Sequence, residues 1–149
     1  MDIKDFGKLI RGITSNVNFY ISVKIEKYGI RQGQFEYFLL IYSNPGINQL
    51  DLARLKNVGK ASVTKALKIL EDHHFILRKT DEKDKRNTQC YITNKGEKIV
   101  DNLINVTLEA EDKLFKDFKN EDKLILYKYL SKMHDNSETL FKSINDETE

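Results

Sequence analysis

Apolar residues recur at helical spacing near both ends of this chain, which predicts long helices there. Over residues 5–28 they lie three or four positions apart along one face, and Gly29 is well placed to end the helix. Residues 94–144 repeat this spacing, with a new helix start at Asn120. Residues 34–43 are apolar nearly all round. That pattern is typical of a short buried helix, although a strand can have the same composition.

A shorter helix is predicted after the turn at residues 44–46, which contains the only proline of the chain. Asn48 followed by Asp51 resembles a capping box, in which Asn48 protects free backbone amides and Asp51 faces the helix dipole. The helix that follows is expected to bury Leu52 and Leu55.

A second short helix is predicted from Lys60 to His73, after an interruption at residues 57–59. Its inward face is expected to consist of Val63, Ala66, Leu67 and Leu70. Two helices joined by a short turn that contains glycine form a helix-turn-helix. Residues 75–79 and 89–92 then have the composition of paired strands, with a highly charged tip between them.

Bulk composition indicates one globular domain over residues 1–149. Apolar residues make up 40% of the chain and charged residues 32%. No apolar run approaches the ~20 residues that a membrane span requires, and the N-terminus lacks the order of a secretory signal. The single cysteine excludes an internal disulfide and fits a reducing compartment, so a cytoplasmic location is expected.

Charge is distributed unevenly, although the net charge is only +2. Residues 46–93 hold ten Lys and Arg against six Asp and Glu, whereas residues 94–149 hold nine against thirteen. A basic middle segment suggests that this part meets a polyanion. A solvated surface can also carry a difference of this size by chance.

The sequence contains no arrangement typical of an enzyme, such as a glycine-rich phosphate loop or a recognisable Ser/His or Cys/His spacing. No two of the three histidines lie four residues apart, so neither a metal site nor a cofactor is predicted. His73 suits the negative end of its helix instead. Cys90 is expected to be a small buried hydrophobic residue, in preference to a redox sensor.

The outward face of the second short helix offers candidate DNA contacts, because the second helix of a helix-turn-helix enters the major groove. They are Lys60, Ala61, Ser62, Thr64, Lys65 and Lys68. Hydroxyls can bond bases or phosphates, methyl groups suit the thymine methyl, and lysine suits guanine or phosphate. Taken alone, the same residues could form the solvated face of an ordinary amphipathic helix. The charged hairpin that follows favours DNA.

In their order, these segments resemble the MarR (multiple antibiotic resistance regulator) type of transcription factor. Residues 49–53 resemble the first helix of the family's helix-turn-helix, and residues 62–71 resemble its recognition helix. Asp84-Lys85-Arg86, followed by Ile92-Thr93, resembles the wing motif, which is Asp-x-Arg, a short spacer and Leu-Thr. Each piece is unspecific, but the ordered set covers essentially the whole chain.

The resemblance implies a mainly α fold with a small β-hairpin wing. The winged helix-turn-helix lobe is expected at residues 34–93, flanked by long dimerisation helices at 5–28 and 94–144. It further implies a homodimeric repressor that binds double-stranded DNA at a pseudo-palindromic operator and that a small ligand releases. The alternative is a winged-helix module that binds another protein and no DNA.

Wing residues receive their roles from this resemblance. Arg86 is expected to enter the minor groove, where a planar, weakly hydrated cation is favoured, and Asp84 is expected to position it. Lys83 and Lys85 are expected to contact phosphates. Two residues depart from the family pattern: Gly59 stands where Ser or Asp is usual, and His74 stands where glycine is common.

Aromatic residues gather where the first two predicted helices should approach the DNA-binding lobe. Tyr20, Tyr28, Tyr37 and Tyr42 are candidates for binding a small phenolic or aromatic effector in the crevice that MarR-type proteins use. Aromatics at helical spacing can equally be plain core residues.

Overall fold

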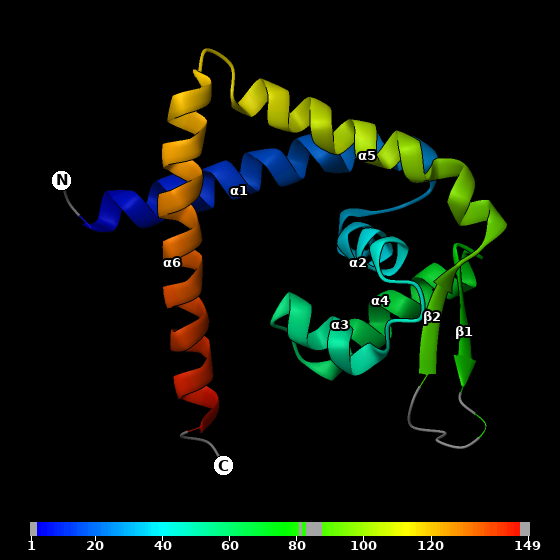
Figure 1. The fold of residues 1–149 in the computed structure, drawn as a ribbon. Coiled ribbons are helices and arrows are strands. Elements are labelled where there is room, and N and C mark those ends of the chain that lie inside the picture. The colour runs from blue at the N-terminus through cyan, green and yellow to red at the C-terminus, as the bar shows by residue number, and fades with distance from the viewer. Residues whose placement is uncertain (1–2, 81, 83–87, 147–149) are drawn as a thin grey trace. The chain divides into compact units, whose positions relative to one another are not determined.

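The computed structural model describes residues 3–80, 82 and 88–146 (Figure 1). Its elements are, in chain order, α1 (Ile3–Ile25), the short 3-10 helix η1 (Glu26–Tyr28), α2 (Gln32–Ser43), α3 (Gln49–Lys56), α4 (Lys60–Asp72), β1 (Ile76–Thr80), β2 (Thr88–Ile92), α5 (Asn94–Leu114) and α6 (Asn120–Asp146). The predicted class, mainly helical with one β-hairpin, is confirmed. Residues 34–43 form a helix and not a strand, and each strand differs from its predicted bounds by a single residue at one or both ends.

Helix α4 lies at the centre of the helix-turn-helix and packs against both α2 and α3. The four inward residues predicted for it are all buried: Val63, Ala66, Leu67 and Leu70. They join a core that includes Phe38 and Ile41 from α2 and Leu52 from α3. Burial of one whole face fixes the rotation of α4 about its own axis, and therefore fixes which residues it presents outward.

Asn48 caps α3 as predicted. The backbone N–H of Asp51 donates to Asn48 Oδ1 at 2.9 Å, and Asn48 Nδ2 donates to Asp51 Oδ2 at 2.9 Å. The helix ends at Asn57, whose φ of 50° is left-handed, a conformation that asparagine tolerates better than most residues. The two caps limit α3 to a little over two turns.

The prediction that Leu55 is buried was wrong, since its side chain is 58% exposed. The buried face of α3 is centred between Leu52 and Ala53, and Leu55 points about 110° away from that centre at 100° per residue. Lys56 occupies the inward position one turn after Leu52. Its ammonium pairs with Glu36 and lies 5.5 Å from the centre of the Tyr37 ring.

Strands β1 and β2 form an antiparallel hairpin in which Ile76 pairs with Ile92 and Thr80 with Thr88. The segment before α3 extends this sheet. Gly46 N–H donates to the Cys90 carbonyl at 2.9 Å, and Cys90 N–H donates to the Ile47 carbonyl at 3.0 Å. The start of α3 is thereby tied to the hairpin as well as to α4.

Gly96 allows α5 to begin close against the core. A Cβ atom at this position would lie 2.6 Å from the backbone oxygen of Phe75 and 2.6 Å from Ile92 Cγ2. Such distances are shorter than any van der Waals contact, and a backbone oxygen cannot move aside as a side chain can. The approach of α5 to the loop between α4 and β1 therefore depends on the absence of a side chain.

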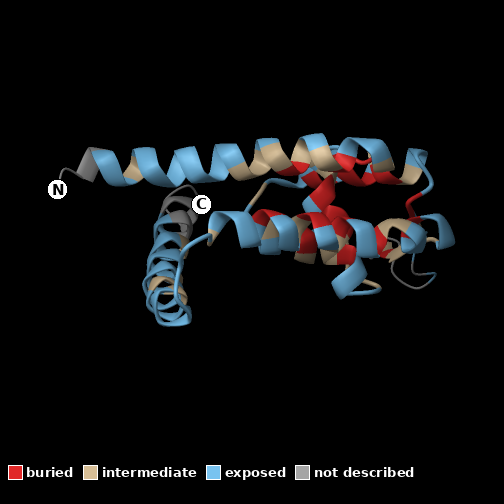
Figure 2. Cartoon of the chain, turned by 90° about the horizontal axis from the view of Figure 1, so that it is seen from above, coloured by how far each residue is buried: buried red, intermediate tan, exposed pale blue. Residues whose placement is uncertain are grey.

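The two halves of α1 differ in burial (Figure 2). Ile21 and Ile25, in its second half, are buried in the core of the lobe. The apolar residues of its first half are exposed: Phe6, Leu9, Ile10 and Ile13. None of the helices in the described residues has the length and hydropathy that a membrane span requires.

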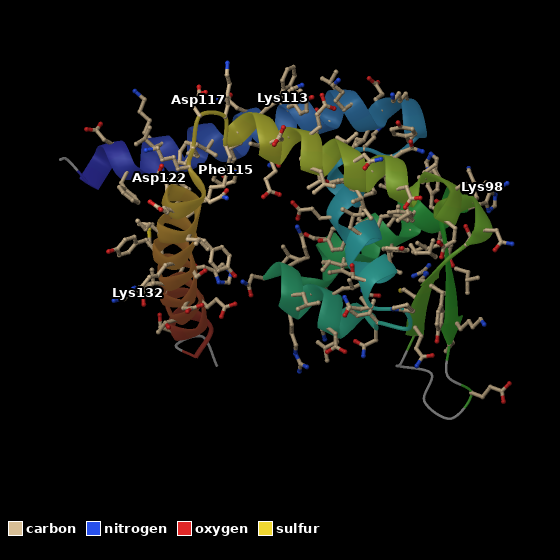
Figure 3. All side chains as sticks on the ribbon, turned by 45° about the horizontal axis from the view of Figure 1, so that its top comes forward. Lys98, Lys113, Phe115, Asp117, Asp122 and Lys132 are labelled. Atoms are coloured by element: carbon tan, nitrogen blue, oxygen red, sulfur yellow. The ribbon has the colours of Figure 1, made fainter. Side chains whose placement is uncertain are left out.

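Residues up to Ala110 and residues from Glu111 onward form two compact units. In the second unit, Phe115 lies in the connection between α5 and α6 and Asp122 lies in the first turn of α6; both are labelled in Figure 3. The Phe115 ring meets the Phe118 ring edge to face at 5.5 Å, and the backbone N–H of Lys119 donates to Asp122 Oδ2 at 3.2 Å. The second contact is half of a capping box and explains why α6 begins where it does.

Candidate DNA-binding surface

The outer face of α4 carries the residues predicted to contact DNA. Lys60, Ala61, Ser62, Thr64, Lys65 and Lys68 are all exposed. They occupy the side opposite the buried stripe, as an amphipathic helix of this pattern requires. The face is polar and basic, with two hydroxyls and three ammonium groups within nine residues. Such a face can meet both base edges and phosphates.

Gly59, the residue just before α4, has an extended conformation and supplies no side-chain cap. The amides of the first turn therefore lack the bond that a Ser or Asp would accept, as expected from this departure from the family pattern. Ser62 N–H donates to the Gly59 carbonyl at 3.2 Å instead, and the positive end of the helix dipole favours an anion at this end of α4.

Gln49 is a residue of this surface to which the sequence pattern assigned no role. Its Nε2 reaches from the first turn of α3 and donates to Thr64 Oγ1, and it lies 3.4 Å from the Lys60 carbonyl oxygen. Thr64 Oγ1 itself donates to the same carbonyl at 2.9 Å. The hydroxyl of Thr64 is therefore engaged within the protein. Only the docking of α3 on α4 makes this contact, so no spacing along the chain could have indicated it.

Lys68 also has a partner within the protein, with which it forms a weak ion pair. Its ammonium lies 3.0 Å from Asp72 Oδ2, one helical turn further along α4, and both side chains are more than half exposed. A pair of this kind contributes only ~0.3–0.5 kcal/mol and breaks at little cost. The lysine can therefore turn to a phosphate.

The predicted wing contacts Lys83, Asp84, Lys85 and Arg86 lie outside the described residues. What the structure describes is the base of the wing. Arg78 on β1 donates through both Nε, at 2.9 Å, and Nη2 to a single carboxylate oxygen of Glu71 near the end of α4. The hydrogen bond to Glu71 raises the pKa of Arg78 above its ordinary value, so the guanidinium stays charged. The Glu71–Arg78 pair therefore joins the wing to α4, and the wing flanks the outer face of that helix.

The loop between α4 and β1 makes a sharp turn at His74, which adopts a left-handed φ of 60°. Thr93 Oγ1 donates to the His74 carbonyl at 2.7 Å, and Lys95 Nζ donates to the His73 carbonyl at 2.7 Å. These two bonds from the start of α5 hold a conformation that is uncommon for histidine. His73 Nδ1 lies 2.8 Å from the Ile69 carbonyl oxygen, which makes that nitrogen the protonated one.

Cys90 is fully buried in β2, as predicted. Burial raises the pKa of its thiol to about 11, from an ordinary value of 9.0. A thiol in this state reacts slowly with oxidants, because the thiolate is the reactive form. Among the described residues, no three His, Cys, Asp or Glu side chains are grouped so that they could hold a metal ion.

The four tyrosines predicted to bind an effector have different surroundings. Tyr20 donates to Glu109 Oε1 at 2.6 Å, Tyr28 lies 5.0 Å from the ammonium of Lys27, Tyr37 is buried and Tyr42 is exposed. Burial raises the pKa of Tyr37 above its ordinary value. Two described surface hollows, one beside α3 and one along α1, are lined by none of the four. An effector site at these tyrosines stays a prediction.

Comparison with known proteins gives consistent matches. A family model described as MarR family matches residues 30–88. The uncharacterized HTH-type transcriptional regulator YybA of Bacillus subtilis is 27% identical over 136 residues, which cover 91% of this chain and 88% of that protein. The crystal structure of a MarR transcriptional regulator from Methanosarcina mazei is 30% identical, with a TM-score of 0.85 over 92% of this chain and 99% of that one. The MepR–DNA complex of S. aureus shares the fold at 23% identity, with a TM-score of 0.80 over 88% of this chain and 95% of that one.

Proposed function

This chain belongs to the MarR family of helix-turn-helix transcriptional regulators, and from that premise we propose that its helix α4 binds the major groove of double-stranded DNA. The observation that carries the proposal is the outer face of α4, six exposed residues held in a fixed orientation by a fully buried inner face. The family and the matched relatives are transcriptional regulators and not enzymes.

The S. aureus neighbour shares the fold and was solved as a complex with DNA, which supports DNA binding by a chain of this fold. The docking mode proposed for this chain places α4 in the major groove. In this mode Lys60, Ala61, Ser62, Thr64, Lys65 and Lys68 meet base edges and the adjacent phosphates. Arg86 enters the flanking minor groove with Asp84 positioning it, while Lys83 and Lys85 contact phosphates. The Glu71–Arg78 pair supports this arrangement because it sets the direction in which the wing leaves α4.

We propose further that the active form is a homodimer. Four large apolar residues are exposed on the first half of α1, and others are exposed on α6, among them Leu124, Ile125 and Leu130. A monomer gains nothing from presenting these surfaces to water, whereas a second copy would bury them. Two α4 helices about 34 Å apart, one turn of DNA, would then read a pseudo-palindrome.

Repression with relief by a small aromatic or phenolic effector completes the proposal, in a cytoplasmic setting. In some conformations of the dimer the distance between the two α4 helices would not match successive major grooves. An effector could release DNA only to the extent that it binds such a conformation more tightly than the conformation that fits DNA. Tyr20, Tyr28, Tyr37 and Tyr42 are the residues proposed for that role. Tyr37 and Tyr42 lie on α2, which packs directly on α4.

Fluorescence anisotropy on genomic fragments, at about 50 and about 200 mM salt, tests DNA binding. We expect affinity to fall by orders of magnitude between the two salts, since each phosphate contact releases counterions. Lys65→Ala should weaken binding about tenfold, whereas Lys132→Ala, on α6, should leave it unchanged. Absence of binding to every fragment at low salt would reject the proposal and favour the protein-interaction module.

A further inference from the structure

The side-chain hydroxyl of Thr64 has no hydrogen left for DNA. It has a single proton, which it donates to the Lys60 carbonyl at 2.9 Å, and its oxygen accepts from Gln49 Nε2. The oxygen keeps one lone pair, which could accept from a base amino group, but thymine offers no donor in the major groove. The Cγ2 methyl is therefore the group of this exposed side chain that can read thymine. A helical threonine ordinarily divides its population between two χ1 rotamers. The bond from Gln49 adds a second constraint, which selects the rotamer already favoured by the Lys60 carbonyl.

We propose that Gln49 is a positioning residue for sequence readout, holding Thr64 so that its methyl, and not its hydroxyl, contacts the 5-methyl group of one thymine in each half-site. The inference rests on the proposed docking of α4 in the major groove. Thymine is the only base that presents a methyl group there, so an apolar reader at this position distinguishes it from cytosine and the purines. Gln49 reaches α4 from a separate helix, so its influence passes through Thr64.

The contact has a chemical signature that can be measured. Replacing one thymine by uracil removes the 5-methyl group and nothing else from the base pair. Loss of one buried methyl should weaken binding about fourfold, equivalent to about 0.8 kcal/mol. Ala61 carries another methyl on the same face, so more than one thymine can respond to uracil. Only the thymine read by Thr64 should depend on Gln49.

The experiment uses the full chain and a duplex that it selects from a randomised 30-base-pair library. Every thymine is replaced by uracil in turn, and the ratio of the dissociation constants for the uracil and thymine duplexes is measured for each variant. A thymine that Ala61 contacts can also give a ratio above one in wild type, and the thymine that Thr64 contacts in each half-site should give a ratio of about four. Thr64→Ser, which keeps the hydroxyl and loses the methyl, should bring the ratio there to about one.

Gln49→Met supplies the test of positioning, since it keeps the length of the side chain and removes the donor. At the thymine that responds to Thr64→Ser, we expect the ratio for Gln49→Met to fall below about two, because the thymine duplex should lose more affinity than the uracil duplex. Thr64→Val should keep the wild-type ratio with or without Gln49→Met. Valine takes one χ1 rotamer in a helix about 90% of the time and needs no partner to hold its methyl groups.

Thr139→Val is the matched control, because the exposed Thr139 on α6 also donates to the carbonyl four residues earlier, at 3.3 Å. It should change no ratio. A merely structural role for Gln49 would weaken both duplexes equally and leave the ratio at about four, which would overturn the inference. A Thr64→Ser ratio still near four would overturn it as well. If the wild-type chain selects no duplex at low salt, the docking proposal fails, which is a different result from either of these.

Discussion

Replacing Glu71 by alanine should loosen the wing from the recognition helix. In the folded chain one oxygen of Glu71 accepts two hydrogen bonds from the Arg78 guanidinium, whose side chain is only 27% exposed, while Glu71 is 36% exposed. Hydrogen bonds to charged groups contribute ~1.5–3 kcal/mol when sheltered, and exposed ion pairs contribute ~0–1. A half-sheltered pair should fall between these limits, so we expect a coupling free energy of about 1–2 kcal/mol.

The assay is a double-mutant cycle by urea unfolding at one fixed protein concentration, with Glu71→Ala, Arg78→Ala and the double variant. Lys68→Ala and Asp72→Ala provide a matched cycle, since that pair lies on the same helix and is more than half exposed on both sides. Its coupling should not exceed about 0.5 kcal/mol. Each 1 kcal/mol should also shift the Tm by about 2–4 °C in a chain of this length.

Equal coupling free energies in the two cycles would refute the reasoning, because they would mean that partial burial adds nothing to the Glu71–Arg78 pair.

A second consequence of Glu71→Ala concerns DNA binding. Glu71→Ala should reduce affinity chiefly for duplexes with A·T-rich flanks, where the wing is proposed to bind, and should leave the preference at the central base pairs unchanged. A uniform loss across all duplexes would indicate general destabilisation and no specific link to the wing.

Three further predictions concern packing, titration and assembly. Gly96→Ala should cost about 1–3 kcal/mol in urea unfolding because the new methyl meets the Phe75 carbonyl at 2.6 Å, whereas Gly12→Ala, with open space around it, should not destabilise. Cys90 should resist iodoacetamide at pH 8 in the native protein and react after unfolding. Burial raises the pKa of the Cys90 thiol from 9.0 to about 11. The contribution of this thiol to the free energy of unfolding should therefore be present below pH 9 and should be lost as the pH rises towards 11. The Cys90→Ala variant should not show this loss. Leu9→Glu should convert a dimer into a monomer in sedimentation velocity, and an unchanged sedimentation coefficient would remove α1 from the proposed interface.

Within single helices, the sequence predicted the structure well. The inner face of α4 follows from its 3.6-residue periodicity, and the Asn48 cap follows from local hydrogen bonding that needs no distant partner. Leu55 shows where periodicity stops being informative. A helix of two turns contains too few apolar residues to define the direction of its buried face, and the pairing of Lys56 with Glu36 on α2 is decided by how the helices dock.

The same limit applies to the candidate site. The exposed residues of α4 could be named from spacing, but the Gln49–Thr64 bond and the Glu71–Arg78 pair join residues that only the tertiary arrangement brings together. Both pairs consist of polar residues of types that are also common on solvated surfaces. Their roles become visible only when partner atoms and exposure are known.

Methylation interference on the selected duplex tests the central claim most directly. Dimethyl sulfate modifies guanine N7 in the major groove and adenine N3 in the minor groove, so a single experiment reports on α4 and on the wing. We predict interference at guanines in two clusters about 10 base pairs apart, and at adenines flanking them, with only the adenine signals lost in Arg86→Ala. Interference confined to adenines, or a single guanine cluster that Lys65→Ala leaves unchanged, would contradict the reading of DNA by paired α4 helices.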